Sequence, residues 1–353
     1  MPAGNLMSAP NMIKPIRDES ELEEVLTRPS AALVDFVRTL SGPLLILGAG
    51  GKMGPTLAVL ARRAAEAGGH PLDVVAVSRF GDAQTLQWLA VRGVKALSCD
   101  LLEAEAVARL PDAENVVYLV GLKFGTVRSP ANTWAINTLV PARVCERYPQ
   151  SRIVALSSGN VYPSSPVKRS GSVESDPLTP AGEYANSVVG RERIFEFCSQ
   201  RNGTAIALLR LCYAVELRYG VLADIARKVN AGEPIALSTG AFNCIWQGDA
   251  NDLILRALPL AASPPSVWNL CRPEVFSVRA VATRLGELLD RIPRFVGEEA
   301  GTALLANATR LCARLGPPPT GLETMLAWVA RWVQSGGRDL GRPTHFEVRD
   351  GNY

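Results

Sequence analysis

Three glycines, Gly48, Gly51 and Gly54, form a GxxGxxG pattern directly after the apolar stretch 43–47. A glycine at a tight turn lets the backbone approach a pyrophosphate closely, because it has no Cβ atom. A helix that starts at this point would also offer free N–H groups and the positive end of its dipole. The pattern therefore predicts a dinucleotide-binding loop, with a purely structural glycine turn as the alternative.

The end of the second apolar stretch bears on which dinucleotide is bound. An acidic residue there would bond the ribose 2′-hydroxyl of NAD, but this chain has Ser78 and Arg79. A guanidinium suits a 2′-phosphate, so we expect NADP to be slightly favoured over NAD. Alternatively, Arg79 stacks on the adenine or points to solvent. Asp100, after the third apolar stretch, is expected to meet the adenine edge.

A lysine, Lys123, follows the apolar stretch 115–121. The carboxyl ends of the strands form the edge of an open parallel sheet at which ligands bind. A cation at this place is a candidate contact for a substrate carboxylate or phosphate. The alternative is a solvated lysine in a loop.

The elements that must position these residues alternate between strand and helix patterns from residue 43 to residue 160. Short apolar stretches at 43–50, 72–80, 94–100, 115–121 and 152–160 are separated by helical patterns. This alternation predicts an α/β fold with a Rossmann-type doubly wound parallel sheet and a smaller C-terminal α/β substrate-binding part. We expect an N-terminal helical extension (1–42), an NAD(P)-binding Rossmann domain (43–213, with 243–262 returning to it), a substrate-binding domain (214–242 and 263–335) and a C-terminal tail (336–353).

Composition narrows the class of protein. The net charge is +3, which is much smaller than the positive charge of proteins that bind nucleic acids or membrane surfaces. The seven cysteines form no CxxC pair, which is typical of a reducing cytoplasm. Two histidines leave little material for a metal site or a Ser-His-Asp triad. We therefore expect a cytoplasmic protein without a metal, a nucleic-acid partner or a membrane partner.

Several segments, in one order over about residues 43–335, resemble an extended short-chain dehydrogenase/reductase of the NAD-dependent epimerase/dehydratase family. They are GAGGKMG, CDLLE, WAINTLVPARVCE, SSGNVY, GEYANSVVGRE, LRLCYAVELRYG, IWQGDAND and VWNLCRPEVFSVRAVA. The resemblance implies a nicotinamide cofactor. The cofactor contacts expected on this basis and from the glycine loop are Gly48, Gly51, Lys52, Met53, Gly54, Ser78, Arg79, Asp100, Leu101, Val120 and Tyr184.

The resemblance also implies catalytic roles. Tyr184 would be the general acid/base, Ser158 would bond the substrate oxygen, and the family's asparagine falls at Asn137. The family's lysine, four residues after the tyrosine, is Val188 in this chain. A nearby cation lowers a phenol's pKa from its usual value near 10 by about 1–3 units, so its loss would reduce the tyrosinate fraction ~10- to ~1000-fold.

Two cations are candidates to compensate for the missing lysine. Arg191 lies seven residues after Tyr184 on the same helical face, although an ion pair with a nearby acid would also explain it. Lys123 is the second candidate, so we place it with the catalytic residues Tyr184, Ser158 and Asn137. The substrate contacts that we expect are Lys123, Asn160, Tyr162, Arg191, Tyr213, Arg218 and Trp246.

These residues support two interpretations of the whole chain. In the first, the protein is an NAD(P)-dependent epimerase, dehydratase or reductase that acts on a sugar, nucleotide sugar or sugar acid. In the second, it is a catalytically weakened NAD(P)-binding sensor or scaffold of the same fold. Val188 favours the second interpretation, whereas the retained Asn137, Ser158 and Tyr184 favour the enzyme. The family often dimerises through the helices around residues 137 and 184, so the resemblance also implies a homodimer.

Overall fold

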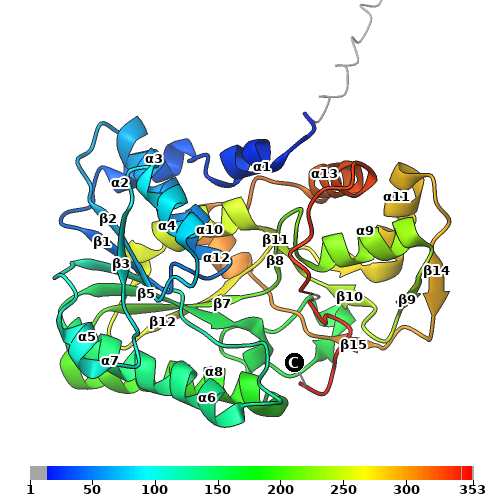
Figure 1. Ribbon diagram of the computed structural model, residues 1–353. Coiled ribbons are helices and arrows are strands. Elements are labelled where there is room, and N and C mark those ends of the chain that lie inside the picture. Colours follow the sequence, from blue (N-terminus) through cyan, green and yellow to red (C-terminus); the bar gives the residue numbers. More distant parts are fainter. Residues whose placement is uncertain (1–13, 343, 352–353) are drawn as a thin grey trace, which may run out of the picture.

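The computed structural model describes residues 14–342 and 344–351. The first residues of the predicted extension (1–13) and the last of the tail (352–353) lie outside this description. Seven parallel strands form the main sheet in the order β12-β7-β5-β4-β1-β2-β3 (Figure 1). They are β1 (Leu44–Leu47), β2 (Val74–Ser78), β3 (Lys95–Ser98), β4 (Asn115–Tyr118), β5 (Arg152–Ser158), β7 (Ile206–Leu211) and β12 (Ser266–Leu270). The order changes direction between β1 and β4, which makes this a doubly wound sheet, as predicted.

Helices cover both faces of the sheet, because successive side chains of each central strand point to opposite faces. In β1, Leu44 and Ile46 join one buried cluster, whereas Leu45 and Leu47 join another. The first face carries α2 (Ala31–Val37), α3 (Gly54–Ala67), α4 (Ala83–Ala90), α10 (Gln247–Arg256) and α12 (Thr309–Leu315). The second carries α5 (Ala104–Ala108), α6 (Pro130–Trp134), α7 (Val140–Arg147) and α8 (Gly182–Asn202), and a π-helical turn, Ala135–Leu139, joins α6 to α7.

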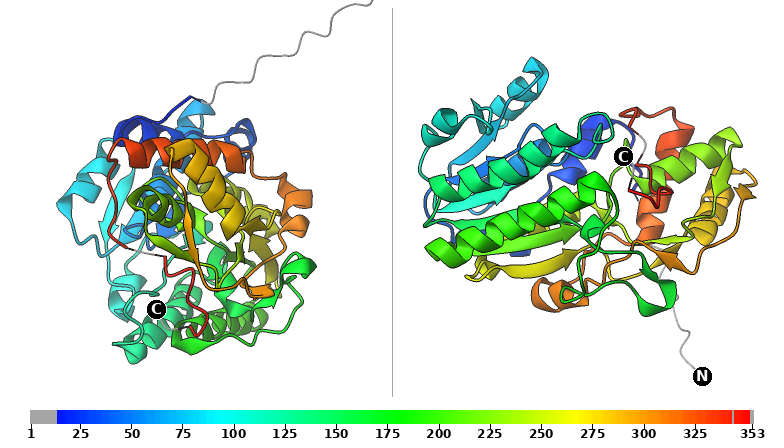
Figure 2. Two further views of the ribbon diagram at one scale, coloured as in Figure 1. Left: turned by 90° about the vertical axis from the view of Figure 1, so that its right-hand side faces the viewer. Right: turned by 90° about the horizontal axis from the view of Figure 1, so that it is seen from below.

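A smaller part packs beside the carboxyl ends of the strands (Figures 1 and 2). Its core is a three-helix cluster of α9 (Val221–Ala231), α11 (Val278–Leu289) and α13 (Leu322–Gln334). Four short strand pairs surround this cluster. They are β8 (Ala214–Val215) with β11 (Ile245–Trp246), β9 (Pro234–Ala236) with β14 (Arg294–Val296), β10 (Ala241–Phe242) with β13 (Phe276–Ser277), and β6 (Ser165–Pro166) with β15 (Thr302–Ala303).

The strand pairing differs from the predicted division of the chain at one place. Residues 266–270 form β12, which pairs with β7 at the edge of the main sheet, whereas the sequence placed 263–335 in the smaller part. A short apolar stretch fits either sheet, because its pattern does not identify the partner strand.

Both ends of the described chain pack against this framework. Helix α1 (Glu19–Leu26) buries Leu22 and Leu26 in the core of the smaller part. Residues 344–351 run between the two parts toward the start of α8, as the red segment in Figure 1 shows. In the described part of the chain, no helix combines the length and hydropathy needed to cross a membrane.

Candidate active site

The glycine loop lies between β1 and α3, at the carboxyl edge of the sheet. Gly48 has a φ of +83°, and a Cβ atom there would lie 2.9 Å from the backbone nitrogen of Val120. A Cβ atom on Gly54 would lie 2.5 Å from the Cα atom of Ala49. Both positions therefore exclude larger side chains, and they keep the loop backbone close to β4 and to the first turn of α3.

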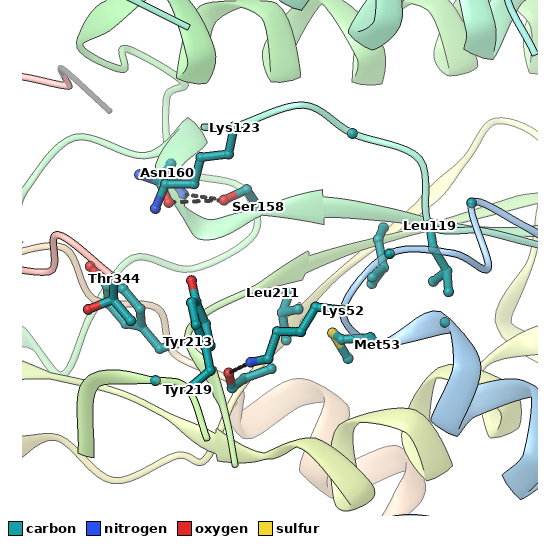
Figure 3. Close-up of a pocket in the computed structure, with 17 residues that line it drawn as sticks. Lys52, Met53, Leu119, Lys123, Ser158, Asn160, Leu211, Tyr213, Tyr219 and Thr344 are labelled. Atoms are coloured by element: carbon teal, nitrogen blue, oxygen red, sulfur yellow. Dashed lines mark hydrogen bonds between the residues drawn. The ribbon is translucent and has the colours of Figure 1, made fainter. Parts of the chain in front are cut away.

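Two cavities open on either side of this loop. We call the first the central cavity; it has a volume of about 280 Å³ and lies between the sheet and the smaller part. Its lining residues are Gly48, Gly51, Lys52, Met53, Gly54, Leu119, Gly121, Lys123, Leu156, Ser158, Asn160, Leu211, Tyr213, Ala214, Tyr219, Gly220 and Thr344. Figure 3 shows this cavity, with Lys123 on one side and Lys52 on the other.

The second cavity, here the edge cavity, has a volume of about 240 Å³ and lies over the ends of β2 and β3. It is lined by Gly48, Gly50, Gly51, Ser78, Arg79, Cys99, Asp100, Leu101, Leu102, Leu119, Val120, Gly121, Leu122, Ile136 and Val140. The predicted adenosine-side residues Ser78, Arg79 and Asp100 therefore share one cavity. The guanidinium of Arg79 lies 3.9 Å from the Asp100 carboxylate.

The predicted catalytic residues reach the central cavity unequally. Ser158 caps the turn after β5 and accepts a hydrogen bond from the Asn160 backbone N–H at 3.2 Å. The Lys123 ammonium lies 5.9 Å from the centre of the Tyr184 ring, beside the cavity wall. Val188 is fully buried in the apolar cluster that includes Tyr184. The cation found beside Tyr184 is therefore Lys123, which lies in the loop after β4.

Both lysines of the central cavity are partly buried. Burial lowers the pKa of Lys123 from its usual 10.5 to about 8. It lowers the pKa of Lys52 to about 7, against the opposing effect of nearby Glu216. The Lys52 ammonium donates a hydrogen bond to the Ala214 carbonyl at 2.7 Å and lies 3.9 Å from the centre of the Tyr219 ring. Desolvation disfavours the charged form of each lysine.

Asn137 and Arg191 lie behind the cavity wall. The Asn137 side chain accepts a hydrogen bond from the Leu122 N–H at 3.1 Å and donates one to the Ser187 hydroxyl at 2.8 Å. Arg191 donates to the Asn137 side chain and, at 3.0 Å, to the Leu156 carbonyl. Arg191 therefore bonds an amide and a carbonyl, and these two residues hold the loop that carries Lys123.

Three further predicted contacts lie in buried networks. The Tyr162 hydroxyl donates to Asn269 at 2.8 Å and accepts from Arg210 at 2.7 Å. Arg210 also forms a buried ion pair with Glu192 at 2.7 Å.

The other two predicted contacts, Arg218 and Trp246, have partners of their own. Arg218 forms ion pairs with Glu216 and Glu19. Trp246 is 2% exposed and packs against Trp328. The structure does not bring Tyr162, Arg218 or Trp246 to the central cavity.

Sequence reasoning missed several residues of the central cavity. Thr344 comes from the tail, 120 positions from its hydrogen-bond partner Asp224, and no local pattern signals that contact. Ala214 follows β7, and an alanine gives no chemical signal. Gly121 faces Arg191, since a Cβ atom there would lie 2.7 Å from the Arg191 Nη2 atom.

Comparison with known proteins identifies the family to which this chain belongs. The model of the NAD dependent epimerase/dehydratase family matches residues 44–271. The chain therefore belongs to this family, an extended branch of the short-chain dehydrogenases/reductases, as the sequence motifs predicted. No curated protein matches the chain.

Solved structures show the same fold at low sequence identity. UDP-glucose 4-epimerase from Thermus thermophilus, solved with NAD, is 19% identical with a TM-score of 0.65; the match covers 82% of this chain and 97% of that one. dTDP-glucose 4,6-dehydratase from Streptomyces venezuelae, also solved with NAD, is 18% identical with a TM-score of 0.67, over 83% and 97% of the chains. dTDP-glucose 4,6-dehydratase from Bacillus anthracis, again with NAD, is 15% identical with a TM-score of 0.69, over 83% and 97%.

The residues present fit a dinucleotide. Gly48 and Gly54 have no side chains, and the backbone packs closely at both positions. The space next to the N-terminus of α3 is therefore open to a phosphate, which the backbone N–H groups there favour. The edge cavity and the central cavity meet at Gly48, Gly51, Leu119 and Gly121, which line both. An adenosine half and a nicotinamide half would therefore lie on either side of one phosphate-binding turn. The slight preference for NADP predicted from Ser78 and Arg79 stays a prediction.

Proposed function

We propose that this protein is an NAD(P)-dependent oxidoreductase, epimerase or dehydratase that acts on a hydroxyl-bearing carbon of a sugar-like substrate. The observation that carries the proposal is the meeting of Ser158, Asn160 and Lys123 in one cavity with the glycine loop, with Tyr184 beside Lys123. The solved relatives act on nucleotide sugars, according to their names, and hold NAD. We therefore propose NAD as the first cofactor to test, and competition between NAD and NADP for the purified protein measures the contribution of Arg79.

We propose a separate role in the reaction for each of these residues. A bound nicotinamide supplies the carbon that exchanges hydride with the substrate. Ser158 orients the substrate oxygen by a hydrogen bond, and the Tyr184 phenol exchanges the proton of that oxygen. The Lys123 ammonium stabilises the negative charge that develops on Tyr184, in the place of the lysine that Val188 replaces. Asn137 and Arg191 act as positioning residues, since they hold the Leu122–Lys123 backbone.

Removing the Tyr184 hydroxyl tests the proposal. We expect Tyr184→Phe to reduce kcat for any substrate about 10²- to 10⁴-fold, because proton transfer loses its donor and acceptor. Affinity for NAD, measured by calorimetry, should change little. Tight NAD binding without turnover by the unmodified protein, over a broad panel of sugars and sugar acids, would instead support the sensor or scaffold.

The predicted homodimer is a separate proposal. Trp134 and Leu139, in the α6–α7 segment, are large apolar side chains that are 37% and 51% exposed. Apolar surface on this segment supports dimerisation through these helices. Light scattering of the unmodified protein and of Leu139→Glu tests it.

A further inference from the structure

The side chain of Lys52 occupies an unexpected place for a residue of a phosphate-binding loop. It lines the central cavity, whereas the residues that line the edge cavity do not include it. Its ammonium reaches across to the smaller part, where it meets the Ala214 carbonyl at 2.7 Å and the Tyr219 ring at 3.9 Å (Figure 3). Lys52 therefore joins the loop that binds the cofactor to the wall that faces the substrate.

The charged residues that line the central cavity are both lysines, although the carboxylates of Glu216 and Asp224 lie near Lys52. Lys52 and Lys123 line it from different sides, and none of its lining residues within 14–342 and 344–351 is an aspartate or glutamate. Burial disfavours the charged form of both lysines. An anion placed here would attract both ammonium groups and favour their charged forms, so the cavity is suited to a negatively charged ligand.

The size and the other polar groups of the cavity define the ligand further. A volume of about 280 Å³ is just below the range of about 300–1,000 Å³ for small-molecule sites, and the nicotinamide half of the cofactor would take part of it. The tail closes one side, because Thr344 lines the cavity while both its N–H and its hydroxyl bond Asp224. Ser158, Asn160 and Tyr219 present hydroxyl and amide groups of the kind that bind polyols.

We propose that the substrate is a compact anionic polyol, either a sugar acid or a sugar phosphate, and that Lys52 binds its carboxylate or phosphoryl group. This inference rests on the proposed function for the identity of the reaction, but the anion site itself does not need turnover. It names Lys52 as a residue that determines specificity, in addition to its place in the glycine loop. The competing role for the same ammonium is a contact with the cofactor's pyrophosphate.

Binding to the NAD-loaded protein tests the inference. Gluconate, glucose 6-phosphate and glucose are the first probes, followed by a wider panel of aldonates, uronates and sugar phosphates with their neutral parents. Thermal protection measures binding. The absorbance of reduced nicotinamide detects net oxidation or reduction, and chromatography of the products detects an isomer or a dehydrated sugar. We expect charged probes to protect the protein and the matching neutral sugars to protect it at least tenfold more weakly.

Two variants separate Lys52 from a general charge effect. Lys52→Met keeps the length of the side chain and removes the ammonium, so the affinity for the charged probe should fall ~10- to ~100-fold while NAD affinity stays within about twofold. Lys95→Met, at an exposed position that begins β3, is the matched control and should change neither affinity. Protection by carboxylates alone or by phosphates alone identifies the group that Lys52 binds, and either result supports the inference.

Three outcomes would overturn the inference: equal protection by neutral sugars, no protection by any charged probe, or a loss of NAD affinity in Lys52→Met without a loss of anion affinity. Failure of the proposed function looks different. In that case a charged probe protects the protein through Lys52, but no probe on the panel changes the redox state of the nicotinamide or is converted to an isomer or a dehydrated product.

Discussion

At the scale of single residues, Lys123 occupies the position with the clearest chemical consequence. Val188 stands on α8 where the resemblance to the family predicts a lysine, and the Lys123 ammonium lies 5.9 Å from the Tyr184 ring centre. The cation therefore comes from a loop after a strand instead of from the helix. Lys123 lies near Tyr184 because the loop and α8 meet at the same edge of the sheet.

We predict that Lys123→Met lowers kcat about 10- to 1000-fold, because the developing phenolate loses its cation. Combining it with Tyr184→Phe should add little to the loss, since both changes remove one proton-transfer unit. Steady-state kinetics of the two single variants and the double variant measure this coupling. Lys168→Met, an exposed lysine, is the control. Unchanged turnover and unchanged NAD affinity in Lys123→Met would exclude the role.

The lowered pKa of Lys52 gives a second prediction, about pH. An anion binds the ammonium form, and in the unliganded site that form is lost as pH rises through about 7. Affinity for a charged probe should thus be highest below pH 7 and fall by up to about tenfold per pH unit above it. The neighbouring groups Glu216, Asp224, Arg218 and Tyr219 are common to the unmodified protein and the variant, and so is Lys123, whose pKa of about 8 adds a second loss of charge in this range. Calorimetry from pH 6 to 9 should show a flatter profile in Lys52→Met; equal slopes would contradict the assignment.

At the scale of elements, the network behind the cavity joins α8 to the ends of two strands. Arg191 on α8 bonds the Leu156 carbonyl of β5, and through Asn137 it reaches the backbone after β4. Gly121 leaves room for the guanidinium. The helix that carries Tyr184 and the loop that carries Lys123 are therefore fixed to one another by buried hydrogen bonds.

We predict that Arg191→Met destabilises the protein by about 2–4 kcal/mol, because it removes a buried donor from the Leu156 carbonyl and from the Asn137 side chain, which then accepts from the Leu122 N–H alone. Arg193→Met is a matched control on the same helix. Arg193 pairs with Glu196, and its side chain is 62% exposed, so its loss should cost less than about 1 kcal/mol. Urea denaturation measures both, and equal stability of the two variants would show that the network is dispensable.

Most of the fold could be predicted from the sequence because its signals are local. The strand 152–158 is apolar with polar ends, and the glycines between β1 and α3 mark one turn. The site was predictable where a residue ends or follows a strand, as Ser158 and Lys123 do. The buried role of Asn137 depends on Leu122, Ser187 and Arg191, which a helical pattern does not identify. The pairing of β12 with β7 is likewise a long-range choice.

At the scale of the whole molecule, the C-terminal tail joins the smaller part to the Rossmann part. Thr344 bonds Asp224, Glu347 pairs with Lys228 at 3.3 Å, and Arg349 donates to the Thr302 carbonyl at 2.8 Å. Phe346 is buried in the core of the smaller part. The tail thereby forms one wall of the central cavity and links it to the beginning of α8.

Near its end, the tail packs against the residues that begin α8, Ala181 and Gly182. Gly351 has a φ of +78°, and a Cβ atom on it would overlap the carbonyl oxygen of Ala181. We predict that Gly351→Ala detaches the end of the tail, so that the residues around 344–351 are cleaved faster in limited proteolysis. Binding of the charged probe should weaken several-fold, because the cavity loses part of its wall.

Gly341→Ala is the matched control for this last prediction. Its φ of +64° imposes a similar backbone strain, but a Cβ atom there would meet nothing within 4 Å. If the contact with Ala181 is what closes the cavity, only Gly351→Ala should raise both the cleavage rate and the dissociation constant of the probe. If both variants behave alike, backbone strain explains the effect, and the tail does not form a working wall of the site.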